Sequence, residues 1–444
     1  MPQNILARNY KKIILIALGL LLLALASKSI FSLYIVTFTT FLTFFLTYQK
    51  CKLNDDYKVK IIEKYSVPFA FLLLVLFNIF GLIKTLTGTI EVKDSISLLF
   101  VGVTFYVLSA GAYISDTKNK YKKETFIDDF FDLYLYLILP FKLLAGPLEN
   151  PQIIKQFNNI SFTFKSTSRF LYSFSWISLG LFMKFCIASR LTPSELLHFT
   201  DPLGSFICAF LFELKFYFDF AGYSFIAFGF AKLVNLKLTL NFNHPFTANN
   251  VVEFWHKWHI TLGKFLQKYI LYKNLYLFDS RTSKAIFAST IFIISAMWHG
   301  GTINYFFWGL FHGLVYLFYI QKFKHSKIPK FFGYLSMFLF FVFGRMIAID
   351  IHAGRLFEKW INYFNFESYS LFTFGNLNQL FSLGLGTQST LYICILFIFA
   401  EFLQVKYYKK TSYHLFRKPI ISMILFLVTI LYGFNSMELL YARI

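Results

Sequence analysis

The chain carries little charge for its length, and most of that charge has one sign. Only 15% of its 444 residues are charged, whereas soluble domains average about a quarter. Its 43 lysines and arginines outnumber 22 aspartates and glutamates, which gives a formal net charge of +21. By contrast, 57% of the residues are hydrophobic and 22% are aromatic. This balance excludes an ordinary soluble globular domain.

Cysteine is scarce, and the common signature motifs of soluble enzymes are missing. The four cysteines, Cys51, Cys186, Cys208 and Cys394, lie far apart, which argues against a disulfide framework and against a site of paired cysteines. We expect them to be ordinary buried thiols. The chain also lacks Gly-x-Ser-x-Gly, Gly-x-x-x-x-Gly-Lys-Ser/Thr and Gly-x-Gly-x-x-Gly. Hydrolase triads, phosphate loops and dinucleotide turns therefore have no sequence support.

Long apolar runs recur from end to end. They do not alternate with a period of two, as the strands of a membrane barrel would. We therefore predict an all-α, polytopic helical membrane protein, with about eleven transmembrane helices in a single integral membrane domain over residues 1–444. No convincing cleavage site follows the first run, so we expect a retained helix rather than a signal peptide. The runs cover residues 13–26, 30–47, 67–82, 96–114, 133–145, 170–188, 207–220, 286–297, 305–320, 331–349, 391–400 and 420–434.

The basic residues gather in short loops between the apolar runs. Two such loops hold Lys50–Lys64 and Lys118–Lys123. Loop lysines of this kind mostly set topology and contact anionic lipid head groups, so we expect both loops on the cytoplasmic side. No RNA-binding motif or basic helix accompanies them, and we predict no nucleic-acid partner.

Polar and glycine residues interrupt the apolar pattern between about residues 140 and 315. Interruptions of a helix at membrane depth are tolerated where they face protein or a water-filled cavity. A helical bundle with a polar interior is therefore expected for this block. The interrupting segments are Ala145-Gly-Pro147, Gly180-Leu-Phe-Met-Lys184, Phe218-Asp-Phe-Ala-Gly-Tyr-Ser224 and Asn241-Phe-Asn-His-Pro245.

Two histidine-tryptophan clusters stand out in this block, Trp255-His-Lys-Trp-His259 and Trp298-His-Gly-Gly301. Ionisable side chains at membrane depth are costly and are usually kept for function. Histidine is also the side chain best suited to moving protons near neutral pH. We predict that His299 is a catalytic base, with His312 thirteen residues further on. A structural histidine that bonds a neighbouring helix is the alternative for His299.

The first cluster and two nearby residues allow several interpretations. His256 and His259 are three apart, so we expect them near one face of a helix, with Lys257 pointing elsewhere. A metal held by these two and His299 is a rival interpretation, but no carboxylate sits at ligand spacing, and we predict no metal. The tryptophans alone could mark the membrane interface. Asp219 could orient a histidine or, as we expect, pair with Lys215, while His244 is expected to be structural.

These residues suit one reaction class. A histidine base can take the proton of a hydroxyl group as it attacks a thioester, while nearby donors stabilise the oxyanion. No enzyme-bound cofactor is needed, because the acyl thioester is a co-substrate. A transporter or flippase with a histidine proton relay is the alternative from another class. It would show pseudo-symmetric halves with matching broken helices, whereas here the breaks cluster in one block.

The motifs resemble those of the membrane-bound O-acyltransferases, in the bacterial subgroup of alginate O-acetyltransferase and teichoic-acid D-alanyl transferase. In order, they are Phe216-Tyr-Phe-Asp-Phe-Ala-Gly-Tyr-Ser224, Asn241-Phe-Asn-His-Pro-Phe246, Phe254-Trp-His-Lys-Trp-His-Ile-Thr-Leu262, Met297-Trp-His-Gly300 and Trp308-Gly-Leu-Phe-His-Gly313. The resemblance implies a ring of helices around a thinned polar centre. It also makes His299 the essential histidine and His259 the second, and we expect support from His256, Trp258, Trp298, Asp219, Asn304 and His312.

The resemblance implies transfer of an acyl group, as we expect acetyl, to a hydroxyl of an extracytoplasmic polysaccharide or other envelope glycan. The donor would be acyl-CoA or an acyl carrier protein on the cytoplasmic side. The acceptor would be reached directly or through a partner extracytoplasmic acyltransferase. We expect a multi-pass protein of a bacterial cytoplasmic (inner) membrane.

Overall fold

In the computed structural model, all regular secondary structure in the described part of the chain is helical, and no strand occurs there. The all-α prediction is therefore confirmed. The described residues are 2–27, 31–86, 103–117, 125–143, 146–163, 166–299, 303–323, 329–350, 352–370, 385–408 and 412–433. The loop Lys118–Lys123, Ala145, Gly300 and Gly301 lie outside them.

Within these residues, five helices are long and apolar enough to cross a membrane. The shorter apolar helix α19 (Pro419–Tyr432) adds to them. A polytopic membrane protein is confirmed, but the expected number of about eleven spans is not. Some apolar runs form helices too short for a perpendicular span, such as α5 (Val103–Asp116) and α6 (Phe126–Ile138). The five spans are Asn9–Ser27, Thr167–Arg190, Ile303–Phe323, Lys330–Ala348 and Ser389–Tyr407.

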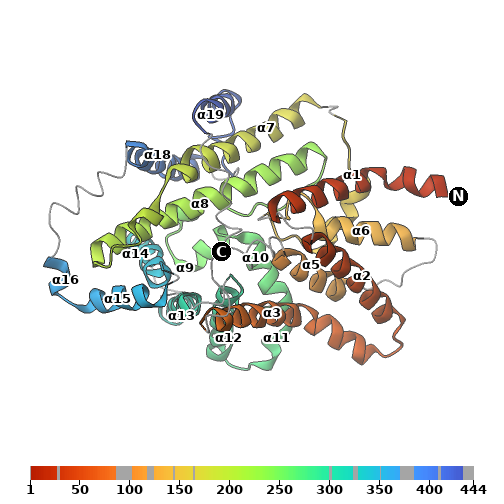
Figure 1. Cartoon of the computed structure of the whole chain (residues 1–444), viewed down its shortest axis with the longest axis horizontal. Helices are drawn as coiled ribbons and strands as arrows, with labels where there is room; N and C mark the ends of the chain where they lie inside the picture. Colours follow the sequence, from red (N-terminus) through yellow and green to blue (C-terminus); the bar gives the residue numbers. More distant parts are fainter. Residues whose placement is uncertain are drawn as a thin grey trace.

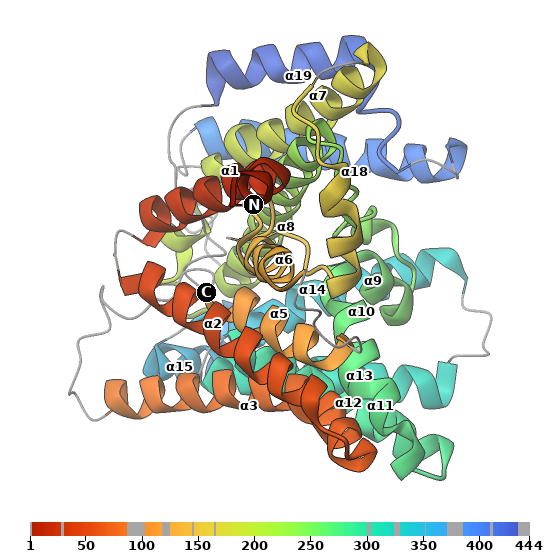
Figure 2. The same ribbon diagram turned by 90° about the vertical axis from the view of Figure 1, so that its right-hand side faces the viewer.

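Figure 1 shows two short helices, α9 and α10, near the middle of the molecule, with the longer helices around them. In Figure 2, as in Figure 1, α12 and α13 lie side by side. The bounds of the α-helices not given above are α1 Pro2–Ser27, α2 Phe31–Lys52, α3 Asp56–Leu86, α7 Thr167–Leu181, α8 Pro202–Leu233, α9 Val251–Lys257, α10 Ile260–Leu266, α11 Tyr272–Asn274, α12 Arg281–His299, α13 Ile303–Phe318, α14 Lys330–Ala348, α15 Ala353–Phe364, α16 Glu367–Ser370 and α18 Leu385–Tyr407.

Two helix pairs pack closely because glycines face the partner helix. On α7, a Cβ at Gly180 would lie 2.5 Å from the carbonyl oxygen of Gly222 on α8. On α13, a Cβ at Gly309 would lie 2.7 Å from the Cβ of Ala296 on α12. Small residues let helices approach in this way inside membranes, where hydrophobic driving force between helices is absent. The second pair brings the end of α12, with His299, beside the start of α13.

One face of the molecule gathers lysines from separate segments. Lys273 donates to the carbonyl of Glu63, at the start of α3, and to the hydroxyl of Ser115, at the end of α5. Lys268 pairs with Asp116 at 2.5 Å. Lys50 bonds the carbonyls of Ile114 and Thr117, and Lys64 bonds the Tyr276 hydroxyl. Lys50 is buried, and we call the face that carries Lys64, Lys268 and Lys273 the basic face.

Candidate active site

A cavity of about 350 Å³ lies among α8, α9, α10, α12, α13 and α14. Aromatic and aliphatic side chains form most of its wall, with a few polar groups among them, which is the usual composition of a ligand site. Its lining brings together residues from both histidine clusters. Its polar or predicted lining residues include Glu213, Trp255, His256, Trp258, His259, Gln267, Ser295, His299, Asn304, Tyr305, His312, Tyr316 and Arg345.

His259 stands at a break between two helices rather than on one helix with His256. Helix α9 ends at Lys257 and α10 begins at Ile260. His259 has φ 42° and ψ 50°, the left-handed conformation that non-glycine residues seldom adopt. The expectation of one shared helix face is therefore wrong, because the chain changes direction between the two histidines. Both still line the cavity, with His256 exposed and His259 buried. Lys257 points elsewhere, toward Glu253 and Thr247.

Asn241 fixes the tautomer of His259. Its side-chain oxygen lies 3.1 Å from Nδ1 of His259 and accepts from the backbone N–H and the hydroxyl of Thr261. A backbone N–H can only donate, so this Asn241 atom is the amide oxygen, and Nδ1 of His259 must donate to it. In the neutral ring, Nε2 is then the unprotonated nitrogen. His259 therefore carries a proton-accepting atom.

His299 is the last residue of α12 and lines the same cavity. Its ring lies 4.5 Å, centroid to centroid, from that of Trp298. It is within electrostatic reach of His259 and of Arg345. The two predicted catalytic histidines thus converge although forty residues separate them. Trp298 is buried away from the cavity lining, between Phe71 of α3 and Phe105 of α5, so it anchors the helix end that carries His299.

Three further polar groups occupy the α13 side of the cavity. His312 is buried with 4% of its surface exposed, and Nδ1 has no hydrogen-bond partner among the described residues. Nε1 of Trp255 is likewise unsatisfied within that part of the chain, and the two rings lie 5.4 Å apart. Asn304 donates to the carbonyl of Ala348, tying α13 to the end of α14. Unsatisfied buried groups beside a cavity favour a polar ligand there.

Asp219 does not pair with Lys215, so that expectation is wrong. Its partner is Lys184, in the π-helical turn Phe182–Ile187 after α7. Lys215 instead donates to the carbonyl of Leu191, 2.7 Å away. Spacing of four residues favoured Lys215, but the close approach of α7 to α8 supplies a cation from another helix. Asp219 is not part of the cavity lining and stabilises the wall behind it.

The sequence reasoning missed an ion pair on the cavity wall. Nε of Arg345, on α14, lies 2.6 Å from Oε1 of Glu213, on α8. Both side chains line the cavity, and the guanidinium lies 5.3 Å from the ring centre of Phe216. For Arg345 the available signal was a lone charge within an apolar run, since such charges at membrane depth usually serve function. Arg345 is the only charge in its run, residues 331–349, whereas Glu213 shares the run 207–220 with Lys215 and Asp219.

The structure adds two observations on metal and thiols. Among the described residues, no three His, Cys, Asp or Glu side chains lie together as a candidate metal site. The four cysteines are buried and form no disulfide. Independence from metal stays a prediction, to be checked by elemental analysis of active protein. Stoichiometric zinc that is lost together with activity on chelation would contradict it.

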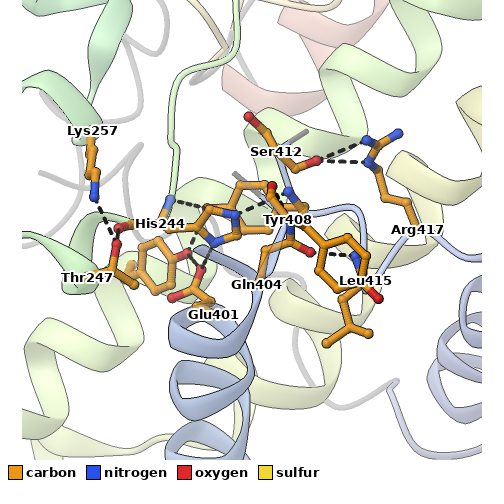
Figure 3. A network of polar contacts seen from close by, with 11 residues as sticks. His244, Thr247, Lys257, Glu401, Gln404, Tyr408, Ser412, Leu415 and Arg417 are labelled. Atoms are coloured by element: carbon orange, nitrogen blue, oxygen red, sulfur yellow. Dashed lines mark hydrogen bonds and ion pairs between the residues drawn. The ribbon is translucent and has the colours of Figure 1, made fainter. Parts of the chain in front are cut away.

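His244 does not line the cavity and belongs to a separate polar network. Its Nδ1 lies 3.2 Å from Oε1 of Glu401, on α18, and its carbonyl accepts from the hydroxyl of Thr247. Figure 3 shows this network, with Lys257 reaching Thr247 at one end and Arg417 bonded to Ser412 at the other. The structure therefore places His244 among structural contacts.

Comparison with known proteins agrees with this site. The model of the MBOAT, or membrane-bound O-acyltransferase, family matches residues 23–327. The chain therefore belongs to the membrane-bound O-acyltransferase family. That match contains both histidine clusters and ends before Arg345 and Glu401.

Several curated relatives are similar over part of their length. The peptidoglycan O-acetyltransferase of Helicobacter pylori is 32% identical over 247 residues, 48% of this chain and 43% of that protein. The probable alginate O-acetylase AlgI of Azotobacter vinelandii is 28% identical over 308 residues, 67% of this chain and 60% of that protein. The teichoic acid D-alanyltransferase of Bacillus subtilis is 23% identical over 230 residues, 49% and 58% respectively. The alignments thus span about half of these relatives.

Proposed function

We propose that the protein is a membrane-embedded O-acyltransferase that moves an acyl group from a thioester to a hydroxyl of an envelope polysaccharide. One observation carries the proposal: in this member of the family, His299 and His259 line the same cavity, and Asn241 fixes the tautomer of His259. The relatives named as peptidoglycan O-acetyltransferase and probable alginate O-acetylase support acetyl as the group and a polysaccharide as the acceptor.

In the proposed reaction, His299 takes the proton of the acceptor hydroxyl as its oxygen attacks the thioester carbonyl carbon. The tetrahedral intermediate collapses, the carbon–sulfur bond breaks, and the thiolate takes up the proton that His299 holds. Neutral His259 presents an unprotonated Nε2, which can accept from the acceptor hydroxyl but cannot donate to a carbonyl. Its proposed role is therefore to orient the acceptor rather than to polarise the thioester.

We further propose that the donor arrives from the basic face and the acceptor from the opposite side. Gln267 and Leu271 line the cavity and flank Lys268. Ala348 and Ile349, at the far end of α14, line it too. Lysines on the basic face could attract coenzyme A phosphates or an acidic carrier protein by charge steering, although several of them already pair with acidic or carbonyl groups. On the positive-inside rule this face is cytoplasmic, in a bacterial inner membrane.

The test is acyl transfer by the purified protein in detergent or nanodiscs, with labelled acetyl thioester. His299→Ala should remain folded and lose about 10²–10⁴-fold in turnover, the usual worth of general base catalysis. A folded variant that keeps more than about a tenth of wild-type turnover contradicts the assignment of His299 as the base. Wild-type protein that turns over no thioester contradicts the proposed function itself.

A further inference from the structure

The loop Asn241–His244 is hydrogen-bonded to the break between α9 and α10, where His259 lies. The N–H of Ile260 donates to the carbonyl of Asn241 at 2.9 Å, and the N–H of Asn243 donates to the carbonyl of Lys257 at 3.0 Å. The loop therefore runs alongside the break and is bonded to it on both sides of His259. Together with the Asn241 side chain, these bonds fix both the backbone and the ring of His259.

A second set of contacts clamps the other end of this loop. His244 has φ 53°, again in the left-handed region, so its conformation must be held by its surroundings. Its N–H donates to the hydroxyl of Tyr413 at 2.9 Å, and the N–H of Tyr413 donates to its Nε2 at 3.2 Å. Since Nε2 accepts, the neutral ring must carry its proton on Nδ1 and donate it to Glu401.

Glu401 accepts from both His244 and Tyr217 in this clamp. The hydroxyl of Tyr217 donates to its Oε1 at 2.5 Å, and so that hydroxyl accepts from Tyr413, 3.0 Å away. The chain of donors thus runs from the His244 amide through two tyrosines to one carboxylate. Glu401 is fully buried on α18, and its Oε2 has no partner within the described residues. A buried, half-satisfied carboxylate is costly, which argues that it is kept for a purpose.

Aromatic packing also connects the bonds around Glu401 to the cavity wall. The ring of Tyr217 lies 6.0 Å from that of Phe242 and 6.1 Å from that of Trp258. Phe242 meets Trp258 edge-on at 5.1 Å. Trp258 lines the cavity and directly precedes His259. Backbone bonds and an aromatic cluster therefore both connect Glu401 to the orientation of His259.

We infer that Glu401 is a positioning residue for His259. It acts through His244, its neighbour in Figure 3, and through the Asn241–His244 loop. The inference rests on the proposed function, because it assigns Glu401 to the same reaction. It extends the site to α18, which lies beyond the family match.

The test is a double-mutant cycle between Glu401→Leu and His259→Ala. Glu401→Leu should lower kcat at least about 10-fold while the KM for the thioester changes less than about 2-fold, because a misplaced acceptor contact affects chemistry more than donor binding. When Glu401→Leu is added to His259→Ala, kcat should fall by less than about a further 2-fold. The effects of two substitutions on kcat are not additive when both residues act through one network. Glu401→Gln, which keeps the Oε1 acceptor, should recover most of the loss.

Asp132→Asn is the matched control. Asp132 is a mostly buried carboxylate that pairs with Lys12 at 2.5 Å between α6 and α1, and it does not line the cavity. It should lower the melting temperature without changing kcat per folded molecule. If Glu401→Leu does not fold, Tyr217→Phe removes one hydroxyl and should show the same non-additivity with a smaller loss. The extent to which diethyl pyrocarbonate labels His259, measured by mass spectrometry, reports a change in the surroundings of His259 without depending on turnover.

Additive losses in the His259→Ala background, or unchanged kcat in folded Glu401→Leu, overturn the inference. So does labelling of His259 that is the same in wild type and Glu401→Leu. These results differ from failure of the proposed function, in which wild-type protein turns over no thioester.

Discussion

Single residues show which parts of the site the sequence pattern predicts and which parts it does not. The two histidine clusters predict a polar centre because charge is rare elsewhere, and His259 and His299 do converge on one cavity. The partner of Asp219 could not be read from spacing, because the cation comes from another helix, 35 residues away. Nor could the tautomer of His259, which depends on Asn241 folding back across the helix break.

The Arg345–Glu213 pair yields a prediction at this scale. Arg345→Met leaves Glu213 without its cation and should destabilise the fold by about 3–5 kcal/mol, the usual cost of breaking a buried pair. The double variant Glu213→Met with Arg345→Met removes both charges and should recover most of that stability. Melting temperatures in detergent check both.

Activity then separates a structural pair from a ligand-binding one. Because both side chains line the cavity, we expect the stable double variant to lose at least about 10-fold in kcat/KM, roughly the worth of one charged hydrogen bond. A double variant with wild-type stability and wild-type kcat/KM would show that the pair only joins α8 to α14.

Helices were the most predictable elements, and their ends the least. Apolar runs indicated most of the long helices, because a membrane requires every backbone group to be satisfied within a helix. His256 and His259 were expected near one face of a helix, but α9 ends at Lys257, between them. Asn241 and Asn243 form backbone hydrogen bonds with Ile260 and Lys257 there, in place of bonds within a helix. No local sequence pattern predicts these bonds.

The junction of α14 and α15 yields a prediction on pH. Burial by itself raises the pKa of Asp350, but hydrogen bonds from Arg355, the His352 amide and Lys359 outweigh it and bring the pKa below the ordinary 3.8. A carboxyl with a lowered pKa stabilises the fold above its ordinary pKa, and this contribution is lost as the pH falls through the lowered value. Lys359 also bonds the carbonyl of Leu197, so the pair docks α15 against the loop before α8.

Asp350→Asn should therefore lower the melting temperature at pH 6–7, and the difference from wild type should shrink as the pH falls below about 4. Thermal unfolding in detergent between pH 3 and 7 measures it. A difference that is constant over this range would mean that the charge of Asp350 contributes nothing. Glu358→Gln on the same helix is the control, since no ion pair of Glu358 is present among the described residues.

For the whole molecule, the sequence indicated the class of protein but not which distant helices contribute residues to the site. Composition and motifs predicted a helical membrane enzyme with a polar block near residues 140–315, and the cavity lies mostly there. Glu401 and Arg345 lie outside that block, on helices whose sequences read as plain spans. Their contacts are between segments more than 130 residues apart, so only folding brings them to the site.

The sidedness of the proposed reaction is the prediction for the whole molecule. If the basic face is cytoplasmic, labelled acetyl thioester should support transfer when supplied to the exposed face of inverted vesicles, and should fail when supplied only to right-side-out vesicles. Lys268→Gln with Lys273→Gln should weaken donor use at low salt, and the effect should fade as ionic strength rises, because screening shortens charge steering to about 10 Å at 0.1 M. Lys155→Gln, at an exposed lysine that is not one of those defining this face, is the control. Transfer that requires donor on the opposite face would reverse the assigned orientation, since a thioester this polar does not cross the bilayer unaided.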